Sequence, residues 1–274
     1  MNRSIKEYKA DARFMLRGNY SLLIMSMILI SLIHSTLSSL FASSTSTFNT
    51  TGVFIQLFAE FLINLLILLG YAGVLKMVLN IMRHEPVSSG MIFYAFKDKA
   101  DRYITASILL VLYCSIPMLL STFLSALFVP DDLVQIANTI TLSEISVLFT
   151  KEFLTFVGIS LALSLASYIV VILMMIPFLF TYQILSDNPD MAGLAAVRES
   201  GKLTRGHYGR ILRTLLSFLG WMFLGLLTLG IGYLWIIPYI VATLTSLYTD
   251  LTQTGYAEKD AGEEDYSSFA QPNE

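Results

Sequence analysis

A long uncharged segment near the C-terminal end of the chain limits the possible folds more than any other feature. It runs from Thr214 to Thr249, is mainly apolar and is broken only by Gly230-Ile231-Gly232. A continuous helix of this length would measure about 54 Å, whereas the hydrocarbon core of a bilayer is about 30 Å thick. The segment must therefore fold back on itself, and the Gly-Ile-Gly sequence suits the turn because glycine tolerates positive φ. We expect two short spans, over residues 214–229 and 233–248.

Composition assigns the whole chain to a membrane. The 274 residues are 55% hydrophobic and 14% charged, with a mean hydropathy of +0.68. Charged residues make up nearer 25% of an ordinary globular domain, so a soluble domain is excluded. The single cysteine, Cys114, lies in an apolar run, and no intrachain disulfide or thiolate metal site can form. The N-terminal apolar run is too long for a signal peptide and lacks a clean cleavage site, so we interpret it as the first span.

The apolar runs predict an all-α, multi-pass membrane protein with about six transmembrane helices arranged as three hairpins, with short basic amphipathic helices on the cytosolic side. Residues 1–251 form the integral membrane domain. Residues 252–274 are rich in acid, Ser and Gly and predict a disordered acidic cytosolic tail. The predicted spans are residues 20–41, 53–75, 103–129, 153–185, 214–229 and 233–248.

Lysine and arginine lie almost entirely on one side of these spans. With the N-terminus in the cytosol, 16 of the 17 basic residues fall in cytosolic segments and only Lys151 lies outside. The positive-inside rule therefore predicts that both termini are cytosolic. A five-span topology would keep most of this bias, so the last crossing depends on the length of the apolar run.

The first nineteen residues predict an amphipathic helix. Its apolar residues recur at helical spacing, at Ile5, Tyr8, Ala12 and Met15. The opposite side carries Arg3, Lys6, Lys9, Arg13 and Arg17. Two interpretations remain open: a helix that lies on an anionic membrane surface, or a solvated helix that flanks the first span.

Each odd-numbered span is introduced by a basic residue close to a tyrosine. The three sequences are Arg17-Gly18-Asn19-Tyr20, Asp101-Arg102-Tyr103 and Arg205-Gly206-His207-Tyr208. They are consistent with three repeats of a basic helix and a hairpin, or with the Arg-Tyr boundaries that any positive-inside protein shows. Before the last of them, Asn188 and Pro189 predict the start of a short helix that continues to about Ser200.

The clustered cations form a candidate face for anionic lipids or a protein partner. Its residues are Arg13, Arg17, Lys97, Lys99, Arg102, Arg198, Lys202, Arg205, Arg210 and Arg213.

A second candidate site lies inside the membrane. Glu60 is the only acidic residue well inside a predicted span, at a cost of about 2.5 to 3.5 kcal/mol on insertion scales. Gln56, Glu60 and Asn64 share a helix face because they are four residues apart, and His34 lies at a similar depth on the preceding span. The group is either a polar seam that joins two helices or a proton or cation site.

The remaining motifs indicate no chemistry. Tyr233, Trp235 and Tyr239 predict an interfacial aromatic belt at the outer end of the last hairpin. We find no nucleophile with its base, phosphate loop or metal cluster, and we therefore expect no catalytic residue and no cofactor.

The last hairpin resembles a known family. The matching residues are Gly201-Lys202-Leu203, Arg205-Gly206, Ser217-Phe218-Leu219-Gly220-Trp221, Thr228-Leu229-Gly230-Ile231-Gly232, Trp235, Pro238-Tyr239, Tyr248 to Leu251 and, near the N-terminus, Ala10 to Tyr20. On these residues the chain resembles the integral membrane family called domain of unknown function 975. The resemblance implies a bacterial cytoplasmic-membrane protein of several helices. It implies no activity, substrate or catalytic residue.

Three classes of function follow from these patterns. We expect a non-enzymatic scaffold or regulatory protein that engages lipids or partners through its basic face. Its partners would be anionic lipid headgroups and a membrane protein or a second copy, with no nucleic acid. The alternative is a small-solute or ion transporter, or a transporter subunit, that uses the polar site around Glu60. A membrane enzyme comes third.

Overall fold

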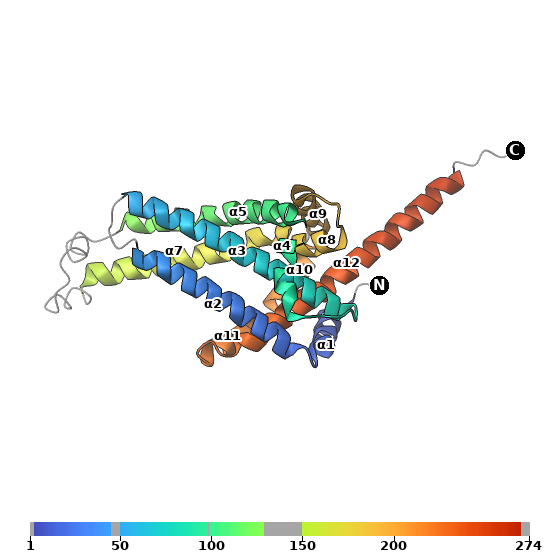
Figure 1. Ribbon diagram of the computed structural model, residues 1–274, viewed down its shortest axis with the longest axis horizontal. Coiled ribbons are helices and arrows are strands. Elements are labelled where there is room, and N and C mark those ends of the chain that lie inside the picture. The colour runs from blue at the N-terminus through green and yellow to red at the C-terminus, as the bar shows by residue number, and fades with distance from the viewer. Residues whose placement is uncertain (1–2, 45–49, 98, 129–149, 270–274) are drawn as a thin grey trace. The chain divides into compact units, whose positions relative to one another are not determined.

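The computed structural model describes residues 3–44, 50–97, 99–128 and 150–269 (Figure 1). These residues contain helices and no strand, so the all-α class is confirmed. Six of the helices are long and apolar enough to cross a membrane. They comprise Tyr20–Phe41, Phe54–Met82, Ala100–Leu124, Lys151–Asp187, Tyr208–Leu227 and Tyr233–Gln253.

The chain forms two compact units. Unit 1 comprises residues 1–108 and 177–274, and unit 2 comprises residues 109–176. The α-helices are α1 (Ile5–Leu16), α2 (Tyr20–Ser44), α3 (Thr50–Met82), α4 (Tyr94–Lys97), α5 (Ala100–Ala126), α7 (Lys151–Met175), α8 (Thr181–Asp187), α9 (Gly193–Arg205), α10 (Tyr208–Leu216), α11 (Leu219–Leu227) and α12 (Tyr233–Phe269). In the part of the chain that the structure describes, two short 3-10 helices cover Ser89–Phe93 and Ile176–Phe178.

The N-terminal helix α1 packs against protein. Ser4 begins it with a capping box, in which Ser4 and Glu7 satisfy each other's backbone N–H groups. Its stripe of Tyr8, Ala12 and Leu16 is fully buried and packs against α12 and α3. Neither interpretation of this helix included that arrangement, because an apolar stripe has the same spacing whether it meets lipid or another helix.

The core of unit 1 is built around α12. Residues of α1, α2, α3 and α12 form one apolar cluster together with Phe218, which lies between α10 and α11. The cluster includes Ala12, Leu16, Leu23, Met27, Ile30, Val74, Met77, Val78, Ile81, Phe218, Tyr239 and Ala242. Tyr239 is only 7% exposed and packs edge-on against the rings of Phe218 and Trp221. The predicted aromatic belt is therefore wrong for Tyr239, which belongs to the core.

The second apolar helix is longer than the sequence predicted. Helix α3 continues without interruption from Thr50 to Met82, past the expected boundary at Leu75. The charge of Lys76 does not end it, because the ammonium lies 5.7 Å from the ring centroid of Tyr94 and so remains stabilised beside protein. At 33 residues the helix is about 50 Å long and extends beyond a bilayer core.

The predicted fold-back near the C-terminal end is confirmed. Gly230 has a φ of +90° and Leu229 a φ of +53°, which reverse the chain between α11 and α12. Gly232 serves a different purpose, because a Cβ there would lie 2.8 Å from the Thr228 hydroxyl and 3.0 Å from the Gly225 Cα. The helix before the turn is also broken, since α10 ends at Leu216 and α11 begins at Leu219.

The last helix continues where the sequence predicted a disordered tail from residue 252. Helix α12 runs without interruption to Phe269, although Pro238 lies inside it. A buried segment has already nucleated this helix, so each further residue adds one hydrogen bond at little extra cost. The tail residues 270–274 lie outside the described residues.

Unit 2 contains α5 from Leu109 onward and the whole of α7. The Ser167 hydroxyl donates to the Pro117 carbonyl at 3.2 Å and so joins the two helices at the proline. Most of their large apolar side chains are exposed, as expected for helices surrounded by lipid.

Candidate functional site

The polar residues predicted inside the membrane do not come together as a connected site. Gln56 and Asn64 are exposed on α3, whereas Glu60 and His34 are half-buried. The Asn64 amide donates to the backbone carbonyl of Glu60 at 2.8 Å. Among the described residues, no hydrogen bond or ion pair joins His34 to Glu60. The possible His34–Glu60 contact is therefore not formed in this structure, and the function of the group stays a prediction.

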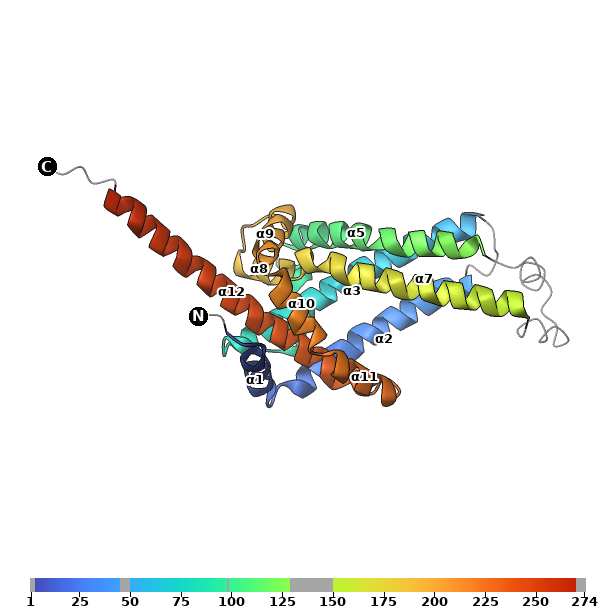
Figure 2. The same ribbon diagram turned by 180° about the vertical axis from the view of Figure 1, so that it is seen from behind.

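The predicted basic residues are largely exposed. Eight of the ten lie on the surface, namely Arg13, Arg17, Lys97, Lys99, Arg198, Lys202, Arg205 and Arg213. Six of these make no ion pair with a described residue, namely Arg13, Arg17, Lys97, Arg198, Arg205 and Arg213. Five of these cations lie on α1, α4, α9 and α10, and Arg17 directly follows α1. These four helices lie at one end of unit 1, away from the start of α3 (Figures 1 and 2). We call this the basic end.

Arg102 does not belong to this exposed face. It is only 4% exposed, and its guanidinium donates to the carbonyls of Leu185 and Asn188 at 3.2 and 2.8 Å. These carbonyls lie at the C-terminus of α8, where a cation offsets the negative end of the helix dipole. The same geometry overturns the predicted N-cap, because Asn188 ends α8 and the next helix begins only at Gly193.

The second exception is Arg210, which clasps two other helices. Its guanidinium binds the carboxylate of Asp250 on α12 and the hydroxyl of Tyr8 on α1. The Tyr8 hydroxyl in turn donates to Asp250 at 2.7 Å. The Arg210 and Asp250 side chains are only 19% and 11% exposed. Burial and the hydrogen bond to Asp250 raise the pKa of Tyr8. We call Tyr8, Arg210 and Asp250 the Arg210 clasp.

A second clasp of the same chemistry holds α12 to α3 and α8. The Arg83 guanidinium donates two parallel hydrogen bonds to Asp187, at 2.7 and 2.8 Å. The Tyr248 hydroxyl donates to the same carboxylate at 2.8 Å. Its hydrogen bond to Asp187 raises the pKa of Arg83. We call Arg83, Asp187 and Tyr248 the Arg83 clasp.

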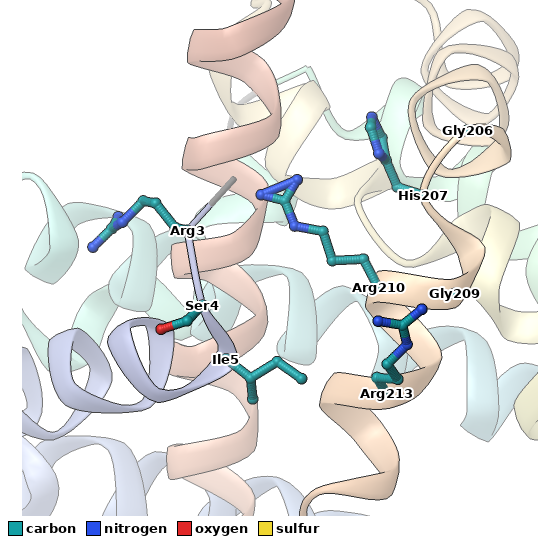
Figure 3. A pocket seen from close by; sticks show the side chains of 8 residues that line it. All are labelled: Arg3, Ser4, Ile5, Gly206, His207, Gly209, Arg210 and Arg213. Carbon is teal, nitrogen blue, oxygen red and sulfur yellow. The ribbon is translucent and has the colours of Figure 1, made fainter. Parts of the chain in front are cut away.

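A basic cleft opens beside the Arg210 clasp. It has a volume of about 690 Å³. Figure 3 shows it between the start of α1, which carries Arg3 and Ile5, and α10, from which Arg210 and Arg213 extend. Its lining consists of Arg3, Ser4, Ile5, Gly206, His207, Gly209, Arg210 and Arg213.

The charges in the basic cleft are only partly compensated. Arg3 pairs with Asp11 and Arg210 with Asp250, whereas Arg213 is exposed and makes no ion pair with a described residue. Guanidinium groups bind phosphate and carboxylate oxygens through paired N–H donors. The cleft can therefore hold an anion without losing the contacts that fold the protein. In the part of the chain that the structure describes, no group of His, Cys, Asp and Glu is arranged to hold a metal ion.

Sequence reasoning found the basic residues of this region but missed their acidic and phenolic partners. Tyr8 and Asp250 are 242 residues apart, so no local pattern connects them. A signal was present nonetheless. Asp187 and Asp250 are the first acids after long uncharged runs, and a carboxylate at the end of a span is well placed to meet cations at the membrane surface.

These features define a multi-pass α-helical membrane protein with a basic surface at one end of unit 1. The chain belongs to the family described as "Protein of unknown function (DUF975)", whose model matches residues 1–255. The resemblance in the last hairpin is thus confirmed over nearly the whole chain. The comparisons with curated proteins and with solved structures give no match.

Proposed function

We propose that this protein is a non-enzymatic scaffold or regulatory protein of the bacterial cytoplasmic membrane, with both termini in the cytosol. Its basic end binds anionic lipid headgroups and so positions a membrane protein partner or a second copy. The observation that carries the proposal is the basic cleft, where Arg213 is exposed without an ion-pair partner among the described residues, beside five more such cations at the same end.

The energetics favour many weak contacts over one strong one. A basic residue near an anionic membrane surface contributes about 1 kcal/mol, and the attraction fades within a Debye length of about 8 Å at physiological salt. Six exposed cations at one end therefore suffice for a stable preference for anionic lipid. The exposed residues of α9, Arg198 and Arg205, add to it without any role in the packing of unit 1.

The test measures thermal stabilisation of the detergent-purified protein by phosphatidylglycerol and by phosphatidylcholine. We expect phosphatidylglycerol to raise the Tm and phosphatidylcholine to do so far less. Arg213→Gln combined with Arg198→Gln and Arg205→Gln should remove most of the difference, and added salt should mimic the triple variant. Lys151→Gln is the matched control, because this exposed lysine lies outside the basic end. The proposal is refuted if the two lipids raise the Tm equally. It is also refuted if phosphatidylglycerol raises the Tm of the triple variant as much as that of the unchanged protein.

A transporter remains the second candidate because Glu60 is a half-buried carboxylate inside an apolar helix. Glu60→Gln separates the two functions. A lipid-binding scaffold should keep its response to phosphatidylglycerol in this variant. If Glu60 instead binds a proton or cation, that cation should stabilise the unchanged protein but not the Glu60→Gln variant.

A further inference from the structure

The hairpin formed by α11 and the start of α12 has a short first helix, and its apolar side chains are largely exposed. Helix α11 has nine residues and is about 14 Å long, which is half of a hydrocarbon core of about 30 Å. Its apolar side chains are exposed almost all round, with Phe223 60% and Leu227 64% exposed. Gly225 is its one buried residue and touches the ring of Tyr233. Such a helix needs lipid around it.

A lysine side chain contacts the backbone directly before α11 begins. The Lys9 ammonium on α1 donates to the Ser217 carbonyl at 2.8 Å and lies 4.0 Å from the ring centroid of Phe218. An ammonium group remains at the level of headgroups or water. Ser217 therefore lies at the membrane surface on the side of the basic end, and α11 enters the bilayer directly after it.

The turn at the tip carries no charge and satisfies its own backbone N–H groups. Each backbone N–H from Thr228 to Ile236 donates to an oxygen within the hairpin. The hydroxyls do the same, because Thr228 donates to the Gly225 carbonyl at 2.8 Å and Tyr233 to the Met222 carbonyl at 3.0 Å. Backbone N–H groups at membrane depth must find their partners within the protein, and those of this turn do so. Leu229 at the tip is 94% exposed, so the tip would present a large apolar side chain to water if it lay outside the bilayer.

We propose that α11 and the first turns of α12 form a re-entrant hairpin, which enters the leaflet on the side of the basic end, turns near the bilayer midplane and returns to the same side. Its partner is the acyl chains of that leaflet, which Leu229 and Ile231 contact. The returning leg regains the surface near Thr243, about 15 Å from Tyr233, where the buried hydroxyls of α12 begin. In both overall views the tip stops short of the far ends of α2 and α3 (Figures 1 and 2).

This path leaves four crossings, by α2, α3, α5 and α7, and keeps both termini on one side. The charge distribution is equally consistent with six crossings, since the segment from Thr214 to Thr249 has no charge to orient it. The hairpin would follow this path whether or not the basic cleft binds lipid.

The test places single cysteines in a Cys114→Ala background. Leu229→Cys and Ile231→Cys report on the tip, where both side chains are exposed and a cysteine disturbs no packing. Lys151→Cys and Lys202→Cys, also exposed, report on the two membrane faces. Cells expressing each variant are treated with a membrane-impermeant maleimide, intact and after permeabilisation. We expect one control to react in intact cells, the other only after permeabilisation, and the two tip cysteines in neither condition.

A depth measurement makes the result decisive. A nitroxide label at position 229 of the protein in phosphatidylglycerol bilayers should collide often with oxygen and rarely with a water-soluble nickel chelate, as expected near the midplane. A label at position 202 should show the reverse. The proposal is overturned if the tip cysteines react from the face that Lys151→Cys reports. It is equally overturned if the nickel chelate reaches position 229, because the tip would then lie at one of the two surfaces.

Discussion

The two clasps that hold α12 share their chemistry and differ in their surroundings. Each joins an arginine, an aspartate and a tyrosine from three different segments, and Arg83 directly follows α3. In the Arg83 clasp the arginine is 37% exposed, the aspartate 20%, and a cavity of about 290 Å³ adjoins them. In the Arg210 clasp the arginine is 19% and the aspartate 11% exposed, and the arginine lines the basic cleft of about 690 Å³. Both clasps therefore adjoin a cavity, but the side chains of the Arg83 pair are about twice as exposed as those of the Arg210 pair.

The difference has an energetic meaning. A well-hydrated ion pair contributes little to stability, because water replaces a lost partner. Removing one partner of a buried pair leaves the other charge without compensation, which costs several kcal/mol. The Arg210 clasp also lines the basic cleft, so its arginine is shared between the fold and the proposed anion site. The Arg83 clasp instead lines the cavity of about 290 Å³, which lies outside the basic cleft.

The largest effect is expected from Asp250→Asn. The substitution keeps the size of the side chain but removes the carboxylate from Arg210, so the free energy of unfolding should fall by about 3 kcal/mol. Thermal unfolding of the detergent-purified protein measures the loss. The variant also frees the guanidinium toward the basic cleft, and phosphatidylglycerol should recover part of the lost Tm. A variant as stable as the unchanged protein would show that Arg210 is hydrated in solution.

Asp187→Asn should cost less, about 1.5 kcal/mol. Arg83 loses one of two parallel charge-assisted hydrogen bonds, but the exposed part of its guanidinium regains water. The same thermal unfolding compares the two variants directly, and phosphatidylglycerol should have no special effect on this one. If Asp187→Asn proves the more damaging, exposure does not control the strength of these clasps, and the comparison fails.

The helical fold could be predicted because each long apolar helix corresponds to one continuous apolar stretch of sequence. Apolar runs define the long helices from local sequence alone. The packing partner of α1 could not be predicted. The spacing of Tyr8, Ala12 and Leu16 is the same in a helix that lies on lipid and in one that packs against α12. The break after Leu216 was equally hidden, since its flanking residues are as apolar as those of a continuous span.

The candidate site shows the same division between local and distant information. Exposed cations such as Arg198 and Arg205 follow from helical periodicity alone. Arg102 looks identical in the sequence, yet it is buried against the end of α8, which lies more than eighty residues further along the chain. Whether an arginine faces solvent or caps a helix depends on which segments pack together in the fold. The pattern of charges along the sequence does not predict this packing.

The pH dependence of Tyr8 separates the two clasps further. A pKa raised in the folded protein, here by burial and the bond to Asp250, means that the folded state holds the phenolic proton more tightly than the unfolded state. The stability that Tyr8 contributes is therefore complete below the ordinary tyrosine pKa of about 10 and is lost as the pH rises above it. We expect Tyr8→Phe to lower the Tm at pH 7 by the equivalent of about 1 kcal/mol. This deficit should shrink above pH 10.

Tyr248→Phe is the matched control for that experiment. Its hydroxyl also donates to a clasp carboxylate, so it should cost a similar amount at pH 7. Thermal unfolding of both variants from pH 7 to pH 11 compares their profiles, with the unchanged protein beside them. A deficit of Tyr8→Phe that stays constant across this range would contradict the assignment of the raised pKa to the Arg210 clasp.

The smallest effect is expected at a third ion pair, which extends the comparison to full exposure. Lys99 binds Asp190 at 2.6 Å, and this hydrogen bond lowers the pKa of the exposed Asp190 carboxyl. A lowered pKa gives stability that is present above the ordinary aspartate pKa of about 3.9 and is lost as the pH falls through the lower folded value. Because both groups are hydrated, Asp190→Asn should change the Tm by less than either clasp variant, and added salt should abolish the difference. A large loss that persists in salt would show that exposure is a poor guide to the strength of ion pairs in this protein, and the ranking of the two clasps would then need another cause.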